Sequence, residues 1–411
     1  MRIARQHGTY GQIRRSTKRT CAATPIIALM FIVACSETDR LRISAHAGDP
    51  TAQIKLAHAY VVGEGVPKDT VKAAGWYRKA AEQGNAFAQN NLGALYQSGD
   101  GVSRDLARAA EWYHKAAEQG DATAQLNLGV LHQNGYGVPK DAARAAEWYR
   151  KAAEQGNVFA QNSLGALYLN GDGVSEDVAQ AAEWYRKAAD QGLAEAQLNL
   201  GVLYAIGAGV PRDDAQALVF YRKAAKQGNA IAQFNLGVMY REGNGVFKDA
   251  EQAVKWYREA AEQGFAQAQY ALGLHYEYGE GVPKDHLQAL VWYRKAAEQG
   301  LAEAQYMLGY SYDHGNGVVE DNAQAVYWYH KAAEQGHTDA QYDLALKFFD
   351  GVGIAKNAVH GFKWLELSAL LGNEYARSYL SNSGMRLRDE GRAEVDRLVR
   401  EWIQAHSGEN D

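Results

Sequence analysis

Cysteine is almost missing from this sequence, because the 411 residues include only two, Cys21 and Cys35, both near the N-terminus. Two such residues cannot build a disulfide framework or a zinc site made of cysteine ligands. Proline is also rare, with 6 residues, whereas glycine is plentiful, with 42. That balance is typical of helices that end in glycine. The fold must therefore be held together by packing alone.

An excess of positive charge is also lacking. The chain has 43 Lys and Arg residues against 48 Asp and Glu residues, a formal net charge of −5. Residues 1–34 contain basic residues and no acid, so the rest of the chain is still more acidic. An acidic body repels phosphate backbones. We therefore expect no nucleic-acid partner.

The N-terminus has the pattern of a targeting signal. Behind a basic leader at 1–21, residues 22–34 form an apolar run that is too short to span a bilayer and is typical of a secretory signal. The run ends Ile32-Val33-Ala34-Cys35, which resembles the bacterial lipobox, where the cysteine is lipidated and becomes the mature N-terminus. Ser36 follows in place of aspartate, which resembles the pattern of outer-membrane sorting. We predict a lipoprotein signal peptide at 1–34, lipidation of Cys35 and an outer-membrane lipoprotein that faces the periplasm. The alternatives are a plain cleaved signal, which gives a soluble secreted or periplasmic protein, and an uncleaved anchor.

The rest of the sequence repeats every 36 residues. Tryptophan recurs at that spacing, with Phe220 in the one missing place, and glycine closes each repeat from Gly84 to Gly372. This pattern predicts a tether and partial helix at 35–48, nine repeats at 49–372, and a partial repeat with a capping helix at 373–411. The tryptophans on the grid are Trp76, Trp112, Trp148, Trp184, Trp256, Trp292, Trp328 and Trp364.

Each repeat has the pattern of a helix pair, as residues 85–120 illustrate. Ala88, Leu92 and Tyr96 form one stripe of the first helix. Gly93 lies beside that stripe, and a glycine inside a helix is about 1 kcal/mol less favourable than alanine. Because glycine nevertheless recurs at this position in seven repeats, we predict that two helices approach so closely there that a Cβ would not fit. Asp105 is the expected N-cap of the second helix, and a glutamine three residues after this aspartate in five repeats predicts a capping-box variant. The expected buried face of the second helix is Ala109, Trp112, Tyr113, Ala116 and Ala117.

Two helices of this size cannot bury their faces alone, so the repeats must stack into an all-α solenoid. The pattern Ala-x-x-x-Leu-Gly-x-x-Tyr-x-x-Gly-x-Gly-Val-x-x-Asp is followed by Ala-x-x-Trp-Tyr-Arg-Lys-Ala-Ala-Glu-Gln-Gly. It resembles the Sel-1-like repeat, a relative of the tetratricopeptide repeat, over most of the chain. The resemblance implies a right-handed αα superhelix that acts as a non-enzymatic scaffold or adaptor for other proteins.

Motifs for catalysis and for cofactors are missing. The recurring Gly-x-Gly-Val lacks the third glycine and the preceding strand of a dinucleotide loop, so we interpret it as a helix cap. The sequence also lacks a His-x-x-x-His pair, a Gly-x-Ser-x-Gly elbow and a Ser-x-x-Lys motif. We predict no catalytic residue, no metal and no cofactor. Some cysteine-rich Sel-1-like proteins have been linked to β-lactam binding or hydrolysis, but their paired cysteines are missing here, which makes that alternative remote.

By analogy with tetratricopeptide repeats, the first helices should line a concave groove, with the two positions after each Ala-Gln pair pointing into it. Aromatic side chains at the first position and amides at the second would suit a protein or an extended peptide. A periplasmic glycan or peptidoglycan is the alternative ligand, and ordinary solvated or inter-repeat positions are the other interpretation. The candidate residues are Phe234, Tyr270, Tyr306 and Tyr342 at the first position and Asn91, Asn127, Asn199 and Asn235 at the second.

Overall fold

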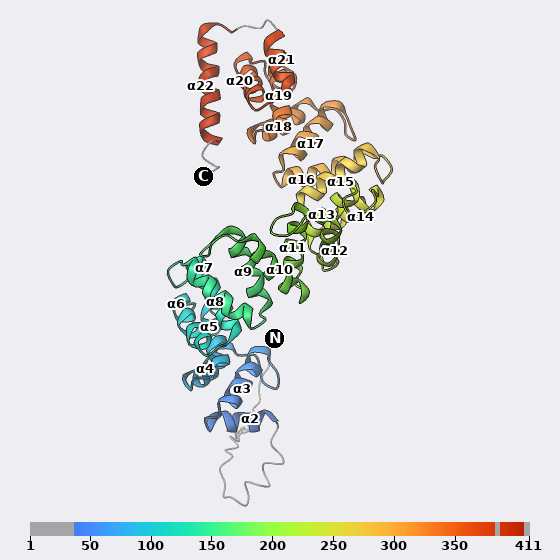
Figure 1. Ribbon diagram of the computed structural model, residues 1–411. Coiled ribbons are helices and arrows are strands. Elements are labelled where there is room, and N and C mark those ends of the chain that lie inside the picture. The colour runs from blue at the N-terminus through green and yellow to red at the C-terminus, as the bar shows by residue number, and fades with distance from the viewer. Residues whose placement is uncertain (1–36, 383–386, 407–411) are drawn as a thin grey trace, which may run out of the picture. The chain divides into compact units, whose positions relative to one another are not determined.

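The computed structural model describes residues 37–382 and 387–406, and in these ranges every regular element is an α-helix (Figure 1). Cys35 and the predicted signal peptide lie outside the described residues. In the described ranges, none of the helices combines the length and the apolar character that a membrane span needs. The chain divides into an N-terminal part, residues 1–157, and a C-terminal part, residues 158–411, and each is described by itself.

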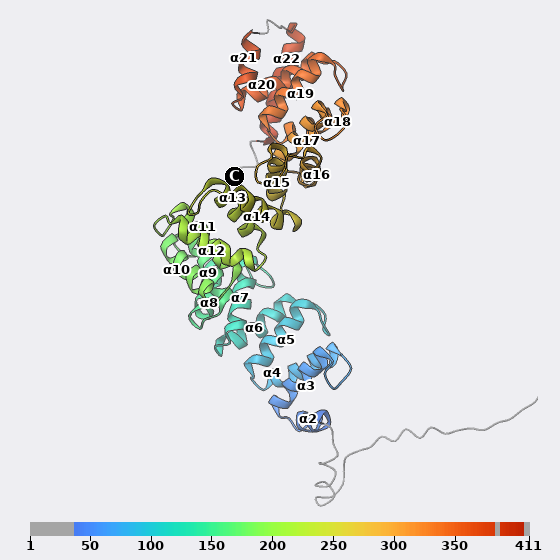
Figure 2. The same ribbon diagram turned by 90° about the vertical axis from the view of Figure 1, so that its right-hand side faces the viewer.

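The helices follow one another in pairs, one pair to a repeat, and Figure 2 shows the same order after a quarter turn. In the N-terminal part they are α2 (Glu37–His46), α3 (Pro50–Val62), α4 (Thr70–Glu82), α5 (Ala86–Ser98), α6 (Leu106–Glu118), α7 (Ala122–Asn134) and α8 (Ala142–Glu154). In the C-terminal part they are α9 (Val158–Asn170), α10 (Val178–Asp190), α11 (Ala194–Ile206), α12 (Asp214–Lys226), α13 (Ala230–Glu242), α14 (Ala250–Glu262), α15 (Ala266–Tyr278), α16 (His286–Glu298), α17 (Ala302–His314), α18 (Asn322–Glu334), α19 (Thr338–Asp350), α20 (Ala358–Leu370), α21 (Glu374–Asn382) and α22 (Asp389–His406).

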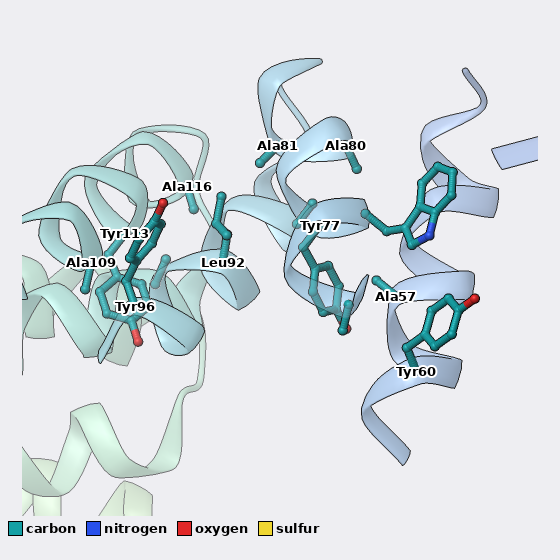
Figure 3. Close-up of a cluster of buried hydrophobic side chains, with 14 of the residues drawn as sticks. Ala57, Tyr60, Tyr77, Ala80, Ala81, Leu92, Tyr96, Ala109, Tyr113 and Ala116 are labelled. Atoms are coloured by element: carbon teal, nitrogen blue, oxygen red, sulfur yellow. The ribbon is translucent and has the colours of Figure 1, made fainter. Parts of the chain in front are cut away.

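The core of each repeat lies between its two helices, and the predicted stripe is buried as expected. In α5, Ala88 and Leu92 are fully buried and Tyr96 is nearly so, and they pack with the fully buried Tyr113 of α6. Figure 3 shows Leu92, Tyr96, Ala109, Tyr113 and Ala116 gathered between these two helices. The all-α solenoid predicted from the repeat pattern is confirmed.

The tryptophans are buried less uniformly than the sequence predicted. Trp148 is buried, but Trp112 is only half-buried, whereas the tyrosine that follows each of them is fully buried. Trp148 packs against His114 of the preceding second helix, with ring centroids 5.8 Å apart. The ammonium of Lys151 covers its ring at 4.0 Å from the centroid. The tyrosines, more than the tryptophans, therefore form the centre of the core.

The mid-helix glycines mark the close approach that the sequence predicted. A Cβ on Gly93 would lie 2.8 Å from the ring of Tyr113, and one on Gly129 would lie 2.6 Å from the ring of Tyr149. The second glycine of the Gly-x-Gly pair has another role, since a Cβ on Gly101 would lie 2.1 Å from the carbonyl oxygen of Thr70. Each pair thus lets a loop pass close to the start of the preceding second helix.

The second helices are capped by aspartate, but the capping box is only half formed. The Asp213 carboxylate accepts from the backbone N–H of Gln216 at 2.9 Å, as an N-cap should. The N–H of Asp213 itself donates to the carbonyl of Tyr204 in the first helix, at 3.0 Å, so it serves the helix pair and not the glutamine side chain. The N-cap aspartates are Asp69, Asp105, Asp141, Asp177, Asp213, Asp249, Asp285 and Asp321.

Both ends of the array have covering helices. Residues 35–48 were expected to supply a tether and a partial helix. There α2 packs on α3 as a second helix would, and Gln53 donates to the carbonyl of Ala45 at 3.1 Å. At the other end, α22 lies beside α20 (Figure 1). Its side chains Val395, Val399 and Trp402 are buried there. The last helix therefore covers the second helix of repeat 9.

Candidate partner-binding face

The predicted binding positions lie on the first helices, on a surface that we call the first-helix face. In the C-terminal part this face is formed by side chains of α13, α15, α17 and α19 that the core leaves half-buried or exposed. The four aromatic residues predicted from the sequence, Phe234, Tyr270, Tyr306 and Tyr342, are all half-buried there.

Packing between helices holds these rings in place. The ring of Phe234 lies 5.6 Å from that of Tyr257 in the second helix of its own repeat. It also lies 5.4 Å from the ring of Phe265, at the N-cap of the next first helix. Tyr270 repeats the first contact with Tyr293, with centroids 6.0 Å apart. Phe234 and Tyr270 therefore each pack against the second helix of their own repeat, and part of each ring stays accessible.

Tyr306 is the most constrained member of the row. Its ring stacks on His337, with centroids 4.6 Å apart and an interplanar angle of 23°, and lies 5.7 Å from the ring of Tyr329. Its hydroxyl hydrogen-bonds the carboxyl of Asp343 in α19. Burial, together with the charges of Asp343 and Asp339, raises the pKa of Tyr306. The tyrosine is a neutral donor with a fixed orientation at all ordinary pH values.

Further aromatic residues extend the row beyond those predicted. Tyr310 lies 6.4 Å from Tyr306, and Tyr342 lies 6.3 Å from Tyr375 and 6.4 Å from Tyr379, both in α21. Tyr375 is 74% exposed. These residues were not predicted from the sequence because they occupy other positions of the first helix. A second aromatic position one helical turn away could have been found from the same repeat alignment.

The asparagines predicted to bind a partner form hydrogen bonds within the array. Asn91 donates to the Phe87 carbonyl of its own helix at 2.7 Å. Asn127 donates to Asn90 at 3.0 Å and Asn199 to Asn162 at 3.2 Å, each in the preceding repeat. Asn235 hydrogen-bonds Tyr221, whose pKa burial nevertheless raises to about 12. These bonds occupy amide groups that the sequence analysis assigned to a peptide backbone.

An acidic residue takes the asparagine position in repeat 9, and the sequence analysis did not select it. Burial raises the pKa of Asp343 to about 6, and the charges of Asp313 and Asp339 raise it further. The hydrogen bond from Tyr306 and the charge of His314 lower this pKa but do not outweigh burial. Lys347, one turn further along α19, is held by Asp313 in α17 and by Asn322 in α18, the latter at 2.9 Å.

Comparison with known families identifies the repeats. The family model described as "Sel1 repeat" matches residues 50–85, 86–121, 122–157, 158–193, 194–229, 230–265, 266–301, 302–337 and 338–373. The chain belongs to the Sel1 repeat family. The matched segments begin one residue later than the repeats drawn from the sequence, and each contains one helix pair.

Two solved Sel1 proteins resemble this chain over most of its length. The protein c5321, described as a protective antigen in uropathogenic Escherichia coli with an SLR fold, is 32% identical, with 90% of this chain and 95% of that chain covered and a TM-score of 0.55. A Sel1 repeat protein from Oxalobacter formigenes is 38% identical, with 75% of this chain and 89% of that chain covered and a TM-score of 0.60. A search of curated proteins finds no match.

Sel1 repeat proteins are generally non-catalytic scaffolds for interactions between proteins. In this Sel1 chain the described residues contain no group of three or more side chains suited to hold a metal ion. The face instead offers oriented rings, hydroxyls and carboxylates. Those groups suit reversible binding of another molecule.

Proposed function

We propose that this chain is a non-enzymatic scaffold of the bacterial cell envelope that binds a protein or peptide on the first-helix face of repeats 6 to 9. The observation that carries the proposal is the row from Phe234 to Tyr342, in which four consecutive repeats each present one half-buried ring. A ring already fixed by packing loses little conformational entropy on binding. Tyrosine in particular offers a large apolar area and a polar tip to a partner.

A glycan is the second candidate ligand, because sugars also stack on aromatic rings. One face of the Tyr306 ring is already covered by His337, and the rings of Phe234 and Tyr270 are tilted against tyrosines of the second helices. Rings whose faces are used in this way favour contact through their edges and hydroxyls. We therefore prefer a protein or peptide to a glycan.

Site-specific photo-crosslinking tests the binding face. The crosslinking amino acid is placed at the exposed Glu303, Asp339 or Tyr375 and, as matched controls, at Glu262 and Glu298 of the second helices. We expect one protein adduct from the first-helix positions in the native host and none from the controls. Adducts confined to the control positions, adducts to glycan, or none at any position would contradict the proposal.

The envelope location is a separate part of the proposal and rests on the lipobox-like sequence that ends at Cys35. Several acyl chains on one cysteine would anchor the chain stably, since each buried CH₂ contributes about 0.8 kcal/mol. Intact mass and fractionation of wild type and Cys35→Ala in a Gram-negative host test this. A mature species acylated at Cys35 in the outer membrane is expected, and an unmodified soluble wild-type protein would contradict it.

A further inference from the structure

Three carboxylates on the first-helix face of repeats 8 and 9 have no basic partner. Asp343 is half-buried in α19, and Glu303 in α17 and Asp339 in α19 are exposed. Among the ion pairs that the described residues form, none includes any of these three. Lys347, the basic residue closest to Asp343 along α19, is held by the carboxylate of Asp313. The face is therefore acidic in the free protein.

These carboxylates share one surface with the tyrosine rings. Tyr306 hydrogen-bonds Asp343 directly. Besides burial, the charge of Glu303 raises the pKa of Tyr270, and the charges of Asp343 and Asp339 raise the pKa of Tyr306. Glu303 lies three residues before Tyr306 in α17, and Asp339 lies three residues before Tyr342 and four before Asp343 in α19. Residues at these spacings are neighbours on a helix surface, so the rings and carboxylates can act on one ligand.

The second helices differ from this face because lysine side chains cover several of their aromatic rings. There a lysine three residues after each of several tryptophans lies over the ring, as Lys187 does over Trp184 at 3.7 Å and Lys295 over Trp292 at 3.9 Å. Within the described ranges, by contrast, no lysine or arginine covers the rings of Tyr270, Tyr306 or Tyr342. These three rings thus have acidic neighbours and no lysine or arginine over them.

We infer that the first-helix face of repeats 8 and 9 receives lysine or arginine side chains of an extended basic peptide, held between Glu303, Asp339 and Asp343 and the rings of Tyr306 and Tyr342. A cation binds more tightly when it contacts both a carboxylate and a tyrosine, through the open face of the ring or the hydroxyl oxygen, than when it contacts only one of them. This inference rests on the proposed function and narrows the partner to one with positive charge.

Partial burial of Asp343 supports the same conclusion. A carboxylate that is removed from water without a counter-ion weakens the free protein, and a bound cation restores the missing interaction. The chain could have placed asparagine there, as it does at Asn199 and Asn235 in earlier repeats. An unpaired charge at that position suits recognition of a partner rather than stability of the array.

The test compares two triple variants of the full chain that remove the same number of charges. The test variant is Glu303→Gln, Asp339→Asn, Asp343→Asn, and the control is Glu251→Gln, Glu262→Gln, Glu298→Gln at exposed positions of second helices. The probes are fluorescent peptides of Lys, Gly and Ser, with Arg and Glu counterparts of equal length. Anisotropy is measured at low and physiological salt, after circular dichroism shows that both variants are folded.

We expect the Lys and Arg peptides to bind wild type and the control alike, and the test variant to bind them at least about tenfold more weakly, while the Glu peptide does not bind. Equal loss in both variants would show attraction to net charge alone and would overturn the inference, as would binding that the test variant retains. If crosslinking from Glu303 or Tyr375 still captures a protein in either case, the scaffold proposal stands and only the basic partner is wrong.

Discussion

At the scale of single residues, the pairing of glycine with tyrosine decides how closely the two helices of a repeat approach. Gly237 illustrates this, because a Cβ there would lie 2.5 Å from the ring of Tyr257, which is fully buried. The ring cannot move away without disturbing the core around it. The sequence predicted the close approach from the recurrence of glycine, but it could not name the tyrosine as the group that requires it.

We predict that Gly237→Ala destabilises the protein although alanine is the better helix former. Overpacking of a full core costs about 1–3 kcal/mol, and a contact this short places the change toward the upper end, above the gain of about 1 kcal/mol from helix propensity. Gly75→Ala is the matched control, since Gly75 lies in α4 with nothing within 4 Å of its Cβ position. Urea denaturation should show a loss for the first variant and a gain for the second; equal gains would refute the packing argument.

The contribution of Asp343 to the stability of the folded protein depends on pH. Because burial raises the pKa of Asp343 to about 6, the folded state binds this proton more tightly than the unfolded chain does. Its contribution to stability is complete below about pH 4 and is lost as the pH rises through about 6. The groups that face it are Tyr306, Asp313 and His314 of α17 and Asp339 of its own helix.

We predict that Asp343→Asn is more stable than wild type at pH 7 by roughly 3 kcal/mol and that the difference disappears near pH 4. Urea denaturation of both proteins from pH 4 to pH 8 measures it, and taking the difference removes the effect of the other carboxyl groups. Asp172→Asn, at an exposed loop position, is the control and should show no such trend. A constant difference across the pH range would contradict the assignment.

At the scale of helices, a ladder of glutamine side chains joins one repeat to the next. Gln335, just after α18, donates to Gln305 of α17 at 2.7 Å, and Gln305 donates to the carbonyl of Ala297 at 3.1 Å. In repeat 9 the ladder stops: Gln341 donates to Ala333, but its own side-chain oxygen is buried without a partner, because Leu371 stands where the next glutamine would be. The helix boundaries followed from local patterns, whereas this bond between repeats depends on how they stack.

We predict that Leu371→Gln stabilises the C-terminal part by about 1 kcal/mol, because the new amide satisfies a buried acceptor and Leu371 is already 48% exposed. The converse change, Gln335→Leu, leaves the Gln305 oxygen without its donor and should cost about 1–3 kcal/mol. Chemical denaturation of both variants measures the two effects. Destabilisation by Leu371→Gln would show that the end of the array cannot accommodate the bond.

At the scale of the whole molecule, stability passes from neighbour to neighbour along the array. The C-terminal end depends on α22, which covers α20 with Val395, Val399 and Trp402. Trp402 also stacks on His406, whose ring lies 2.9 Å from the carbonyl of Glu334 at the end of α18. The sequence predicted a capping helix at the end of the chain, but the periodicity could not show which helix it covers.

We predict that Trp402→Ala costs roughly 3–5 kcal/mol, the range for a large buried ring, and that the effect is local. Hydrogen exchange should speed up in α20 and α22 and stay unchanged in α3 to α8. Ile403→Ala, at the neighbouring and 43% exposed residue, is the control and should leave exchange almost unaltered. Faster exchange throughout the chain would mean that the array unfolds as one unit and not from its end.

The sequence alone determined the repeat length, the helix pairs, the caps, the buried stripe and the family, because each of these depends on residues within one helical turn or at a fixed period. It also located the aromatic row from Phe234 to Tyr342. Only the tertiary structure decided that these rings are half-buried, that Asn127 and Asn199 bond the preceding repeat, and that Asp343 lies without a cation. Those properties arise where a residue meets the neighbouring repeat, since burial and charge there depend on stacking geometry that a single repeat does not contain.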